Sequence, residues 1–183
     1  PGPKDFDFNL QQYGITPERE AAVTFSQPYY TGNQAIFGYA DSAAVGAETI
    51  SDLQDLKIGV AAGTTSLSFV TDVIQPSSDP FVFNDNAAAK QALDTKQIDA
   101  VVADLPTALY ITGVEIEGSE VFGEFPPSDG NEGESWGLLF AKDSPLVECA
   151  DLALAALEAS GALDGITTEW MSQGGAIPEI TLE

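Results

Sequence analysis

The sequence predicts an α/β protein in which a mostly parallel sheet is flanked by helices. Two apolar segments, residues 57–61 and 98–103, have the composition of strands that are buried on both faces. Each is followed at once by helix-start signals, so strands and helices alternate along the chain. That alternation is typical of parallel sheets built with right-handed crossovers. With 183 residues, the chain is long enough for one large domain or two small lobes.

The first elements follow from alternation and helix capping. Large apolar residues alternate with polar ones over residues 5–13, which predicts a strand. Thr16 and Pro17 suit the N-cap and the first position of a short helix. The next elements are expected to be, in chain order, a strand over residues 34–40, a polar loop over 41–48, a short helix opened by a capping box at 51–54, the strand over 57–61 and a helix over 66–74.

The remaining elements continue the alternation and end in two helices. They are expected to be a strand over residues 81–83, a helix capped by Asn84 or Asp85 and reaching Leu93, the strand over 98–103, a helix over 105–111, a strand over 121–125, a loop over 126–134 and a strand over 136–141. A long helix from Ser144 to just before Gly161 should bury a face made of Leu146, Ala150, Ala153, Leu154 and Leu157. In the same region we expect Cys149 to be a buried thiol and Trp170 to pack a last helix over residues 163–173.

Arg19 is a residue that local helix stability does not explain. It occupies the third position of the helix that Thr16 caps, where a capping box would have Glu or Gln. A cation near a helix N-terminus also opposes the helix macrodipole. A bound anion would account for Arg19. The alternative is an ion pair with Glu18, Glu20 or another acidic side chain.

Four segments, in order, resemble the amino-acid-binding proteins of ABC transporters, which form bacterial extracellular solute-binding family 3 and have the type II periplasmic binding fold. They are residues 15–30, with Ile15, Thr16, Arg19, Phe25, Ser26, Pro28, Tyr29 and Tyr30; residues 58–66, IGVAAGTTS; residues 98–104, IDAVVAD; and residues 135–140, SWGLLF, before a C-terminal helix pair with Gly161 and Trp170. The resemblance covers nearly the whole chain. The order and spacing of the four segments make it specific.

The resemblance implies a site for a free amino acid in a cleft between two lobes. Arg19 would bind the ligand carboxylate with two parallel N–H bonds, and the turn with Thr64 and Thr65 would add N–H groups and hydroxyls from the other lobe. Asp104, at the carboxyl end of a strand, would accept from the ligand ammonium. Gly14 stands where a hydroxyl side chain is common in the family, so it would contribute its backbone. The local alternatives are that Thr64 and Asp104 serve as ordinary helix caps.

The resemblance also implies two crossings between the lobes. Lobe 2, with the crossing strands, would comprise residues 31–140, whereas residues 1–30 and 141–183 would form a partial and discontinuous lobe 1. Lobe 1 then has too little sheet for its helices, so the chain is expected to lack an N-terminal segment of at least one strand-helix-strand-helix unit. A second copy of the chain, giving a homo-oligomer, or a rearrangement would cover the apolar surface that this leaves.

Composition argues against several classes of function. The 29 acidic and 6 basic residues give a net charge of −23, which argues against nucleic acid or an anionic membrane surface as a partner. The absence of histidine removes Ser-His-Asp and Cys-His nucleophiles as well as histidine metal ligands, and a single cysteine excludes an intrachain disulfide. We therefore expect no cofactor and no metal. The acidic surface suits an extracytoplasmic protein, whether periplasmic, secreted or lipid-anchored.

The function that the resemblance implies is capture of an amino acid by hinge closure and its delivery to a transporter permease. One alternative is an enzyme of the cyclohexadienyl (prephenate or arogenate) dehydratase type on the same fold, which needs a carboxylate general acid. Glu124, Glu132 and Glu134 are candidates by residue type, but nothing around them in the sequence marks a catalytic site. We therefore expect no enzymatic activity. A second alternative is a sensory ligand-binding domain, which would differ in the sequence fused to it.

Overall fold

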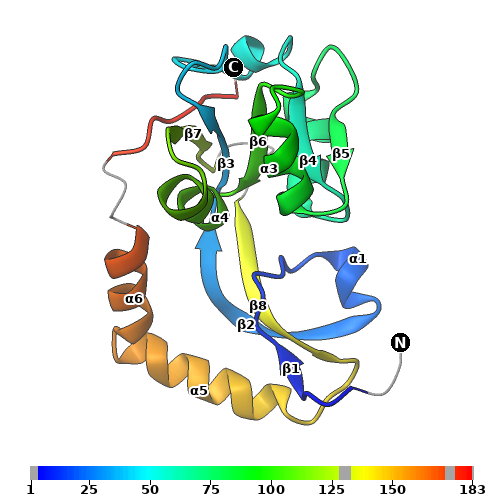
Figure 1. Ribbon diagram of the computed structural model, residues 1–183. Coiled ribbons are helices and arrows are strands. Elements are labelled where there is room, and N and C mark those ends of the chain that lie inside the picture. The colour runs from blue at the N-terminus through cyan, green and yellow to red at the C-terminus, as the bar shows by residue number, and fades with distance from the viewer. Residues whose placement is uncertain (1–3, 128–132, 172–175, 183) are drawn as a thin grey trace. The chain divides into compact units, whose positions relative to one another are not determined.

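The computed structural model describes residues 4–127, 133–171 and 176–182 of the chain (Figure 1). The chain divides into two compact units. Unit 1 comprises Pro1–Gly32 and Glu134–Gln173, and unit 2 comprises Asn33–Gly133 and Gly174–Glu183. Each unit has its own β-sheet. Within the described ranges, no helix is both long enough and apolar enough to cross a membrane.

Unit 2 is built around a five-stranded sheet with the strand order β5-β4-β6-β3-β7. Its strands are β3 (Gln34–Tyr39), β4 (Ile58–Ala61), β5 (Phe81–Phe83), β6 (Ala100–Asp104) and β7 (Ser119–Phe125). Strand β4 pairs in parallel with β5 and β6, whereas β3 pairs antiparallel with β6 and β7. Only β3 therefore runs against the other strands of this described sheet, and the prediction of a mostly parallel sheet is confirmed.

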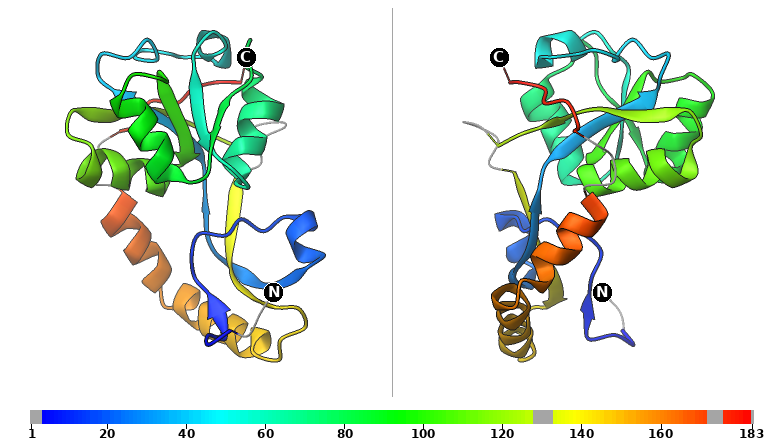
Figure 2. Two further views of the ribbon diagram at one scale, coloured as in Figure 1. Left: turned by 45° about the vertical axis from the view of Figure 1, so that its right-hand side comes forward. Right: turned by 90° about the vertical axis from the view of Figure 1, so that its left-hand side faces the viewer.

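Helices flank this sheet, as the views in Figure 2 show. They are a short 3₁₀ helix (Ile50–Leu53), α2 (Thr65–Phe69) with a π-helical turn (Val70–Ile74), α3 (Asn86–Asp94), and α4 (Leu105–Tyr110) with a second π-helical turn (Ile111–Glu115). The sheet and helices enclose an apolar core that includes Ile36, Leu53, Val60, Val102 and Phe125. The 3₁₀ helix begins after Thr49, whereas the sequence predicted a capping box at residues 51–54. The Asp52 carboxylate accepts from the Thr49 N–H at 2.9 Å, which makes Thr49 the cap.

Residues 176–182 belong to unit 2, although the sequence placed all of residues 141–183 in the first lobe. The Glu124 N–H donates to the Pro178 carbonyl at 2.9 Å, and the Ile180 N–H donates to the Glu124 carbonyl at 2.8 Å. Ile180 is fully buried, in space that Gly123 leaves open. This segment has no helix or strand pattern of its own. Its position depends on partners far away in the sequence, which is why the prediction differed.

Unit 1 contains a three-stranded antiparallel sheet with the order β1-β8-β2. Its elements are β1 (Phe8–Asn9), α1 (Pro17–Glu20), β2 (Val23–Gly32), β8 (Glu134–Ala141), α5 (Val147–Ala159) and α6 (Ala162–Met171). Strand β1 is much shorter than the strand expected over residues 5–13, because only Phe8 and Asn9 pair with β8. The same strand is at an edge of the sheet, and Phe8 is 46% exposed.

The helices of unit 1 bury less apolar surface than the sequence predicted. Of the expected inner face of α5, Leu154 is buried, whereas Leu146 and Leu157 are more than 40% exposed. Trp170 is 65% exposed and Cys149 is exposed as well. The predictions that Leu146, Leu157, Trp170 and Cys149 pack inside were therefore wrong. The reason is that α5 and α6 have mainly β2 and each other as neighbours in the described part of unit 1.

Candidate ligand-binding site

Arg19 lies in α1 and is held in place by local contacts. Its backbone N–H donates to Thr16 Oγ1 at 3.3 Å and Pro17 is the first helical residue, as the capping pattern predicted. The guanidinium Nη1 donates to the Gly14 carbonyl at 2.8 Å, and Cζ lies 5.9 Å from the centre of the Tyr13 ring. The bond to Gly14 uses one of the five N–H donors of the guanidinium. The backbone of Gly14 therefore orients Arg19.

Gly14 lies beside the start of β8. The Ile15 N–H donates to the Ser135 carbonyl at 2.8 Å, and Gly14 forms an antiparallel bridge with Trp136. A Cβ atom at residue 14 would collide with the carboxylate of Glu134. The φ angle of Gly14 is not positive, so space rather than backbone conformation requires glycine here. The resemblance did not place Glu134 in the ligand site, and no local sequence pattern joins residues 14 and 134.

Thr64 caps α2, which is the local alternative that the sequence left open. Its Oγ1 accepts from the Leu67 N–H at 3.2 Å and donates to the Ala61 carbonyl at 2.7 Å. The preceding residue, Gly63, has a φ of +70°, a conformation that favours glycine. Thr65 is the first residue of α2. The Thr64 hydroxyl proton is therefore used within the turn.

Asp104 ends β6 and caps α4. Its Oδ1 accepts from the Thr107 N–H and its Oδ2 accepts from the Thr107 hydroxyl, both at 2.9 Å. Burial raises the pKa of the Asp104 carboxyl, and the two hydrogen bonds from Thr107 lower this pKa in part. The capping role is therefore confirmed. Each oxygen has a second lone pair, so the carboxylate has the capacity to accept from a cation as well.

The predicted residues fall into two groups, one in each unit. In unit 2, β4 and β6 are parallel neighbours, and each leads directly into one of the predicted positions: the Thr64–Thr65 turn after β4, and Asp104 at the end of β6. Ligands of open α/β sheets bind at such carboxyl strand ends. Arg19 and Gly14 form the second group and belong to unit 1.

The glutamates considered for an enzyme have different surroundings. Glu124 Oε2 accepts from Asn33 Nδ2 at 2.7 Å, and its backbone pairs with the C-terminal segment. Glu134 lies against Gly14. Glu132 falls outside the described residues. Glu124 thus has a structural role in unit 2.

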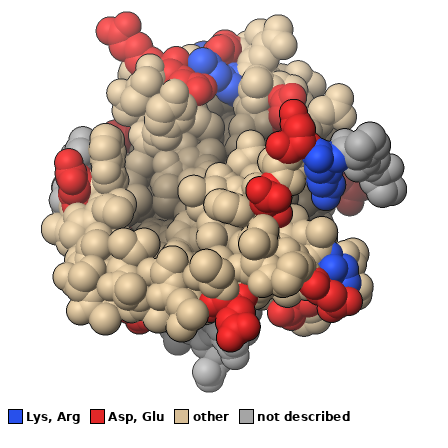
Figure 3. Space-filling model, turned by 90° about the horizontal axis from the view of Figure 1, so that it is seen from below, with Lys and Arg blue, Asp and Glu red and all other residues tan. Residues whose placement is uncertain are grey.

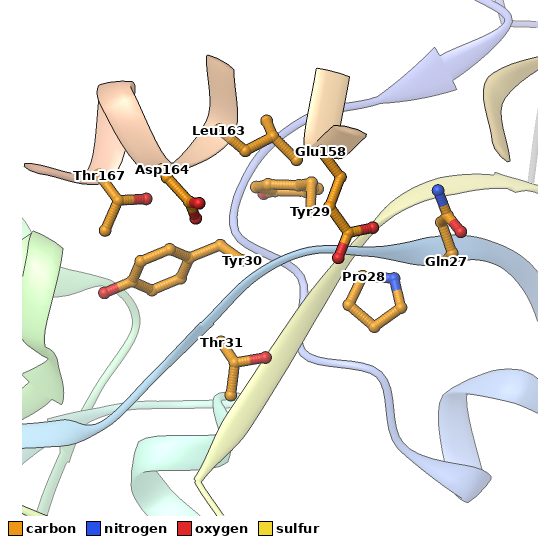
Figure 4. Close-up of a pocket in the computed structure, with 9 residues that line it drawn as sticks. All are labelled: Gln27, Pro28, Tyr29, Tyr30, Thr31, Glu158, Leu163, Asp164 and Thr167. Atoms are coloured by element: carbon orange, nitrogen blue, oxygen red, sulfur yellow. The ribbon is translucent and has the colours of Figure 1, made fainter. Parts of the chain in front are cut away.

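Unit 1 also contains a pocket of about 430 Å³ (Figure 4). Residues of β2, the end of α5 and the start of α6 line it: Gln27, Pro28, Tyr29, Tyr30, Thr31, Glu158, Leu163, Asp164 and Thr167. The Tyr30 ring centre lies 4.8 Å from that of Trp136, so this side chain also packs within the unit. None of the predicted ligand residues lines this pocket.

The chain has far more acidic than basic side chains, 29 against 6. Acidic side chains are spread over the face in Figure 3, with few basic ones among them. Some of the basic residues are paired; Lys96 Nζ, for example, lies 2.8 Å from Asp41 Oδ2. The pKa of Asp41 is lowered, mainly by its hydrogen bond from Lys96. Overall, the field of a chain with net charge −23 favours zwitterionic or cationic ligands over anionic ones.

Comparison with known proteins gives a consistent result. The family model of the bacterial extracellular solute-binding proteins, family 3, matches residues 3–173. The ABC transporter arginine-binding protein 1 of Escherichia coli (strain K12) is 26% identical over 180 residues, which cover 93% of this chain and 68% of the relative. The arginine-binding extracellular protein ArtP of Bacillus subtilis (strain 168) is 27% identical over 176 residues, which cover 92% of this chain and 64% of the relative.

A solved structure shows the same similarity. An ancestral arginine-binding protein bound to arginine has a TM-score of 0.72 and 30% identity, with 91% of this chain and 72% of that chain covered. The present chain thus spans about two thirds of the length of the curated relatives it matches. The chain belongs to the bacterial extracellular solute-binding proteins, family 3, and has the α/β fold of type II periplasmic binding proteins.

Proposed function

We propose that this chain is the amino-acid-binding component of an ABC transporter. The observation that carries the proposal is the Arg19 guanidinium, which Gly14 holds at 2.8 Å and which suits a carboxylate ligand. Relatives named arginine-binding make an amino acid with a basic side chain the first ligand to test. The net charge of −23 supports the same choice, because it favours approach of a cationic amino acid.

In this proposal each charged group of the amino acid has a partner. Arg19 binds the carboxylate, and Thr65 with the neighbouring backbone N–H groups adds a second contact from the other unit. Thr64 positions that turn through its cap, since its hydroxyl proton goes to the Ala61 carbonyl. Asp104 accepts from the ammonium, and a cation beside this partly buried carboxylate would stabilise its ionised form. Gly14 takes part through its carbonyl, which orients Arg19.

Because these partners come from both units, a ligand that contacts both would favour a closed arrangement. The closed form would then deliver the amino acid to the transporter permease. We place the protein outside the cytoplasm, as the names of its relatives suggest, and assign it no cofactor. We also propose that it is not an enzyme. The expected result with prephenate or arogenate is no turnover, and measurable dehydration of either would support the dehydratase alternative instead.

The test is titration calorimetry of the 183-residue chain with L-arginine, after a thermal-shift screen of the common amino acids. Arg19→Ala should weaken binding about tenfold to a hundredfold, because it removes hydrogen bonds to a charged group. Arg19→Lys should restore little, since an ammonium lacks the planar pair of donors. Lys142→Ala is the matched control: it removes one cation from the same unit, where Lys142 Nζ donates to the Glu20 carbonyl at 2.7 Å. Equal affinity in the Arg19→Ala variant and in this control would remove Arg19 from the site.

A separate proposal concerns the exposed apolar side chains of unit 1, which include Phe6, Leu10, Ile166 and Trp170. We propose that a second copy of the chain covers part of this surface, since burial of apolar area drives association. Light scattering coupled to size-exclusion chromatography should then give a mass that rises with protein concentration. A constant monomer mass with a compact hydrodynamic radius would contradict this proposal.

A further inference from the structure

Gly14 of unit 1 lies against both a cationic side chain, Arg19, and an anionic one, Glu134. Its carbonyl accepts from Arg19 Nη1 at 2.8 Å, and the Glu134 carboxylate fills the space that a side chain at residue 14 would need. The same glycine is buried. The residue that carries no side chain is thus flanked by two charged groups of opposite sign from other parts of the chain.

Backbone pairing fixes this arrangement. The segment with Gly14 is held against the start of β8 by the bond from the Ile15 N–H to the Ser135 carbonyl and by the bridge between Gly14 and Trp136. Residue 134 directly precedes this pairing and is itself the first residue of β8, where it pairs with Gly32 of β2. The position of the Glu134 backbone is therefore set on two sides. Its partly buried side chain lies over Gly14.

An α-amino acid has the complementary arrangement of charge, because its carboxylate and its ammonium are attached to one carbon atom. A carboxylate bound to Arg19 would place the ammonium close to the guanidinium, in the region where residue 14 lies. An ammonium has three donors, so it has the capacity to bind Glu134 and still donate to other acceptors. A ligand without an ammonium has no donor to offer to the Glu134 carboxylate, so it would lack this charge-assisted hydrogen bond.

From this arrangement we infer that Glu134 is a specificity-determining residue that accepts from the α-ammonium of the bound amino acid, while Gly14 keeps the space for it. The inference rests on the proposed function, because it concerns the same ligand and the same Arg19. It assigns the selection of amino acids over simple carboxylic acids to unit 1. A larger residue at position 14 would displace Glu134 and should have the same effect as removing its charge.

The experiment compares L-arginine with 5-guanidinopentanoate, which lacks only the α-ammonium, by calorimetry on the whole chain. Glu134→Gln should weaken L-arginine binding about tenfold or more and leave 5-guanidinopentanoate binding unchanged or slightly stronger. Glu18→Gln, an exposed acidic residue in α1, is the control for the loss of one negative charge. The pair L-glutamine and glutaramate repeats the comparison for a neutral side chain.

A double-mutant cycle provides a second, independent readout. Gly14→Ser should weaken L-arginine binding through the displaced carboxylate, so Gly14→Ser and Glu134→Gln should be strongly non-additive. Circular dichroism and urea unfolding of each variant verify that it is folded. Additive effects of the two substitutions would contradict the assigned role of Gly14.

The possible outcomes separate this inference from the proposed function. If Arg19→Ala loses L-arginine while Glu134→Gln binds it as well as Glu18→Gln does, the inference fails and the proposed function stands. If Glu134→Gln weakens L-arginine and 5-guanidinopentanoate equally, Glu134 does not act on the α-ammonium and the inference also fails. If the unmodified chain binds neither L-arginine nor L-glutamine, the proposed function and the inference fail together.

Discussion

Asp104 and Thr107 are joined by two hydrogen bonds of 2.9 Å, one from the backbone N–H and one from the hydroxyl, each to a different carboxylate oxygen. This pair caps α4 and at the same time holds a partly buried carboxylate at the end of β6. Burial opposes the ionised form of Asp104, and the two hydrogen bonds favour it. Burial has the larger effect, so the net shift of the pKa is upward.

Asp104→Asn should change how the stability of the chain depends on pH. The pKa of Asp104 is raised above 3.8 in the folded state, so from pH 3.8 up to the folded pKa the folded chain binds more protons than the unfolded chain. The contribution of Asp104 to the unfolding free energy is therefore lost as pH rises through that window. Asparagine keeps the cap without this titration. Urea unfolding at several pH values should show that the variant loses less stability on going to neutral pH.

Asp85→Asn is the control for this measurement, because Asp85 is an exposed cap whose Oδ1 accepts from the Ala88 N–H at 2.8 Å. If Asp104→Asn has the same pH dependence as the unmodified chain, burial does not set the pKa of Asp104.

Gly123→Ala should loosen the C-terminal segment from β7. A Cβ at residue 123 would lie 2.6 Å from Ile180 Cγ1 and 3.1 Å from the Pro178 carbonyl oxygen, so the segment must shift. Overpacking of this kind costs about 1–3 kcal/mol of unfolding free energy. Hydrogen exchange should show faster exchange of the Ile180 amide, which donates to the Glu124 carbonyl at 2.8 Å.

Gly113→Ala is the matched control, because a Cβ at residue 113 meets nothing within 4 Å. Alanine should be neutral or slightly stabilising there, since glycine is unfavourable in a helical turn. Equal stability of the two alanine variants would show that the Gly123 contact does not hold the segment.

Leu154→Ala and Leu152→Ala should have very different effects, although the two residues are only two positions apart on α5. Leu154 is 7% exposed and Leu152 is 69% exposed. Removing the buried side chain should cost about 2–5 kcal/mol, whereas the exposed one should cost no more than about 0.5 kcal/mol. Thermal or urea unfolding measures the difference. Similar losses from both substitutions would mean that the face with Leu152 is covered in solution.

Cys149 should react in the native state, because it is exposed on α5. A thiol reagent such as 5,5′-dithiobis(2-nitrobenzoate) should label the folded chain at a rate close to that in urea. Cys149→Ser should abolish labelling and leave the unfolding free energy almost unchanged, as expected for a surface substitution. Labelling that requires unfolding would instead support the buried thiol that the sequence predicted.

Local signals in the sequence were sufficient to predict an element or a cap when its physical cause lies within a few residues. The caps at Thr16, Asp85 and Asp104 follow from a short polar side chain placed just before a helical segment, and the structure has each of them. The strands β4, β5 and β6 follow from short apolar runs between helices. The order of these elements is also what made the family recognisable. The family resemblance implies the candidate residues Gly14, Arg19, Thr64, Thr65 and Asp104.

Tertiary structure alone decided what depends on partners far apart in the sequence. The Glu134 carboxylate lies over Gly14 because two segments pair across more than a hundred intervening residues, and no local pattern signals that pairing. The same reason explains the C-terminal segment on β7 and the exposure of Leu157 and Trp170. A hydrophobic pattern states which face of a helix is apolar. Whether that face is buried depends on the surface that other elements offer, and this is a property of the folded chain.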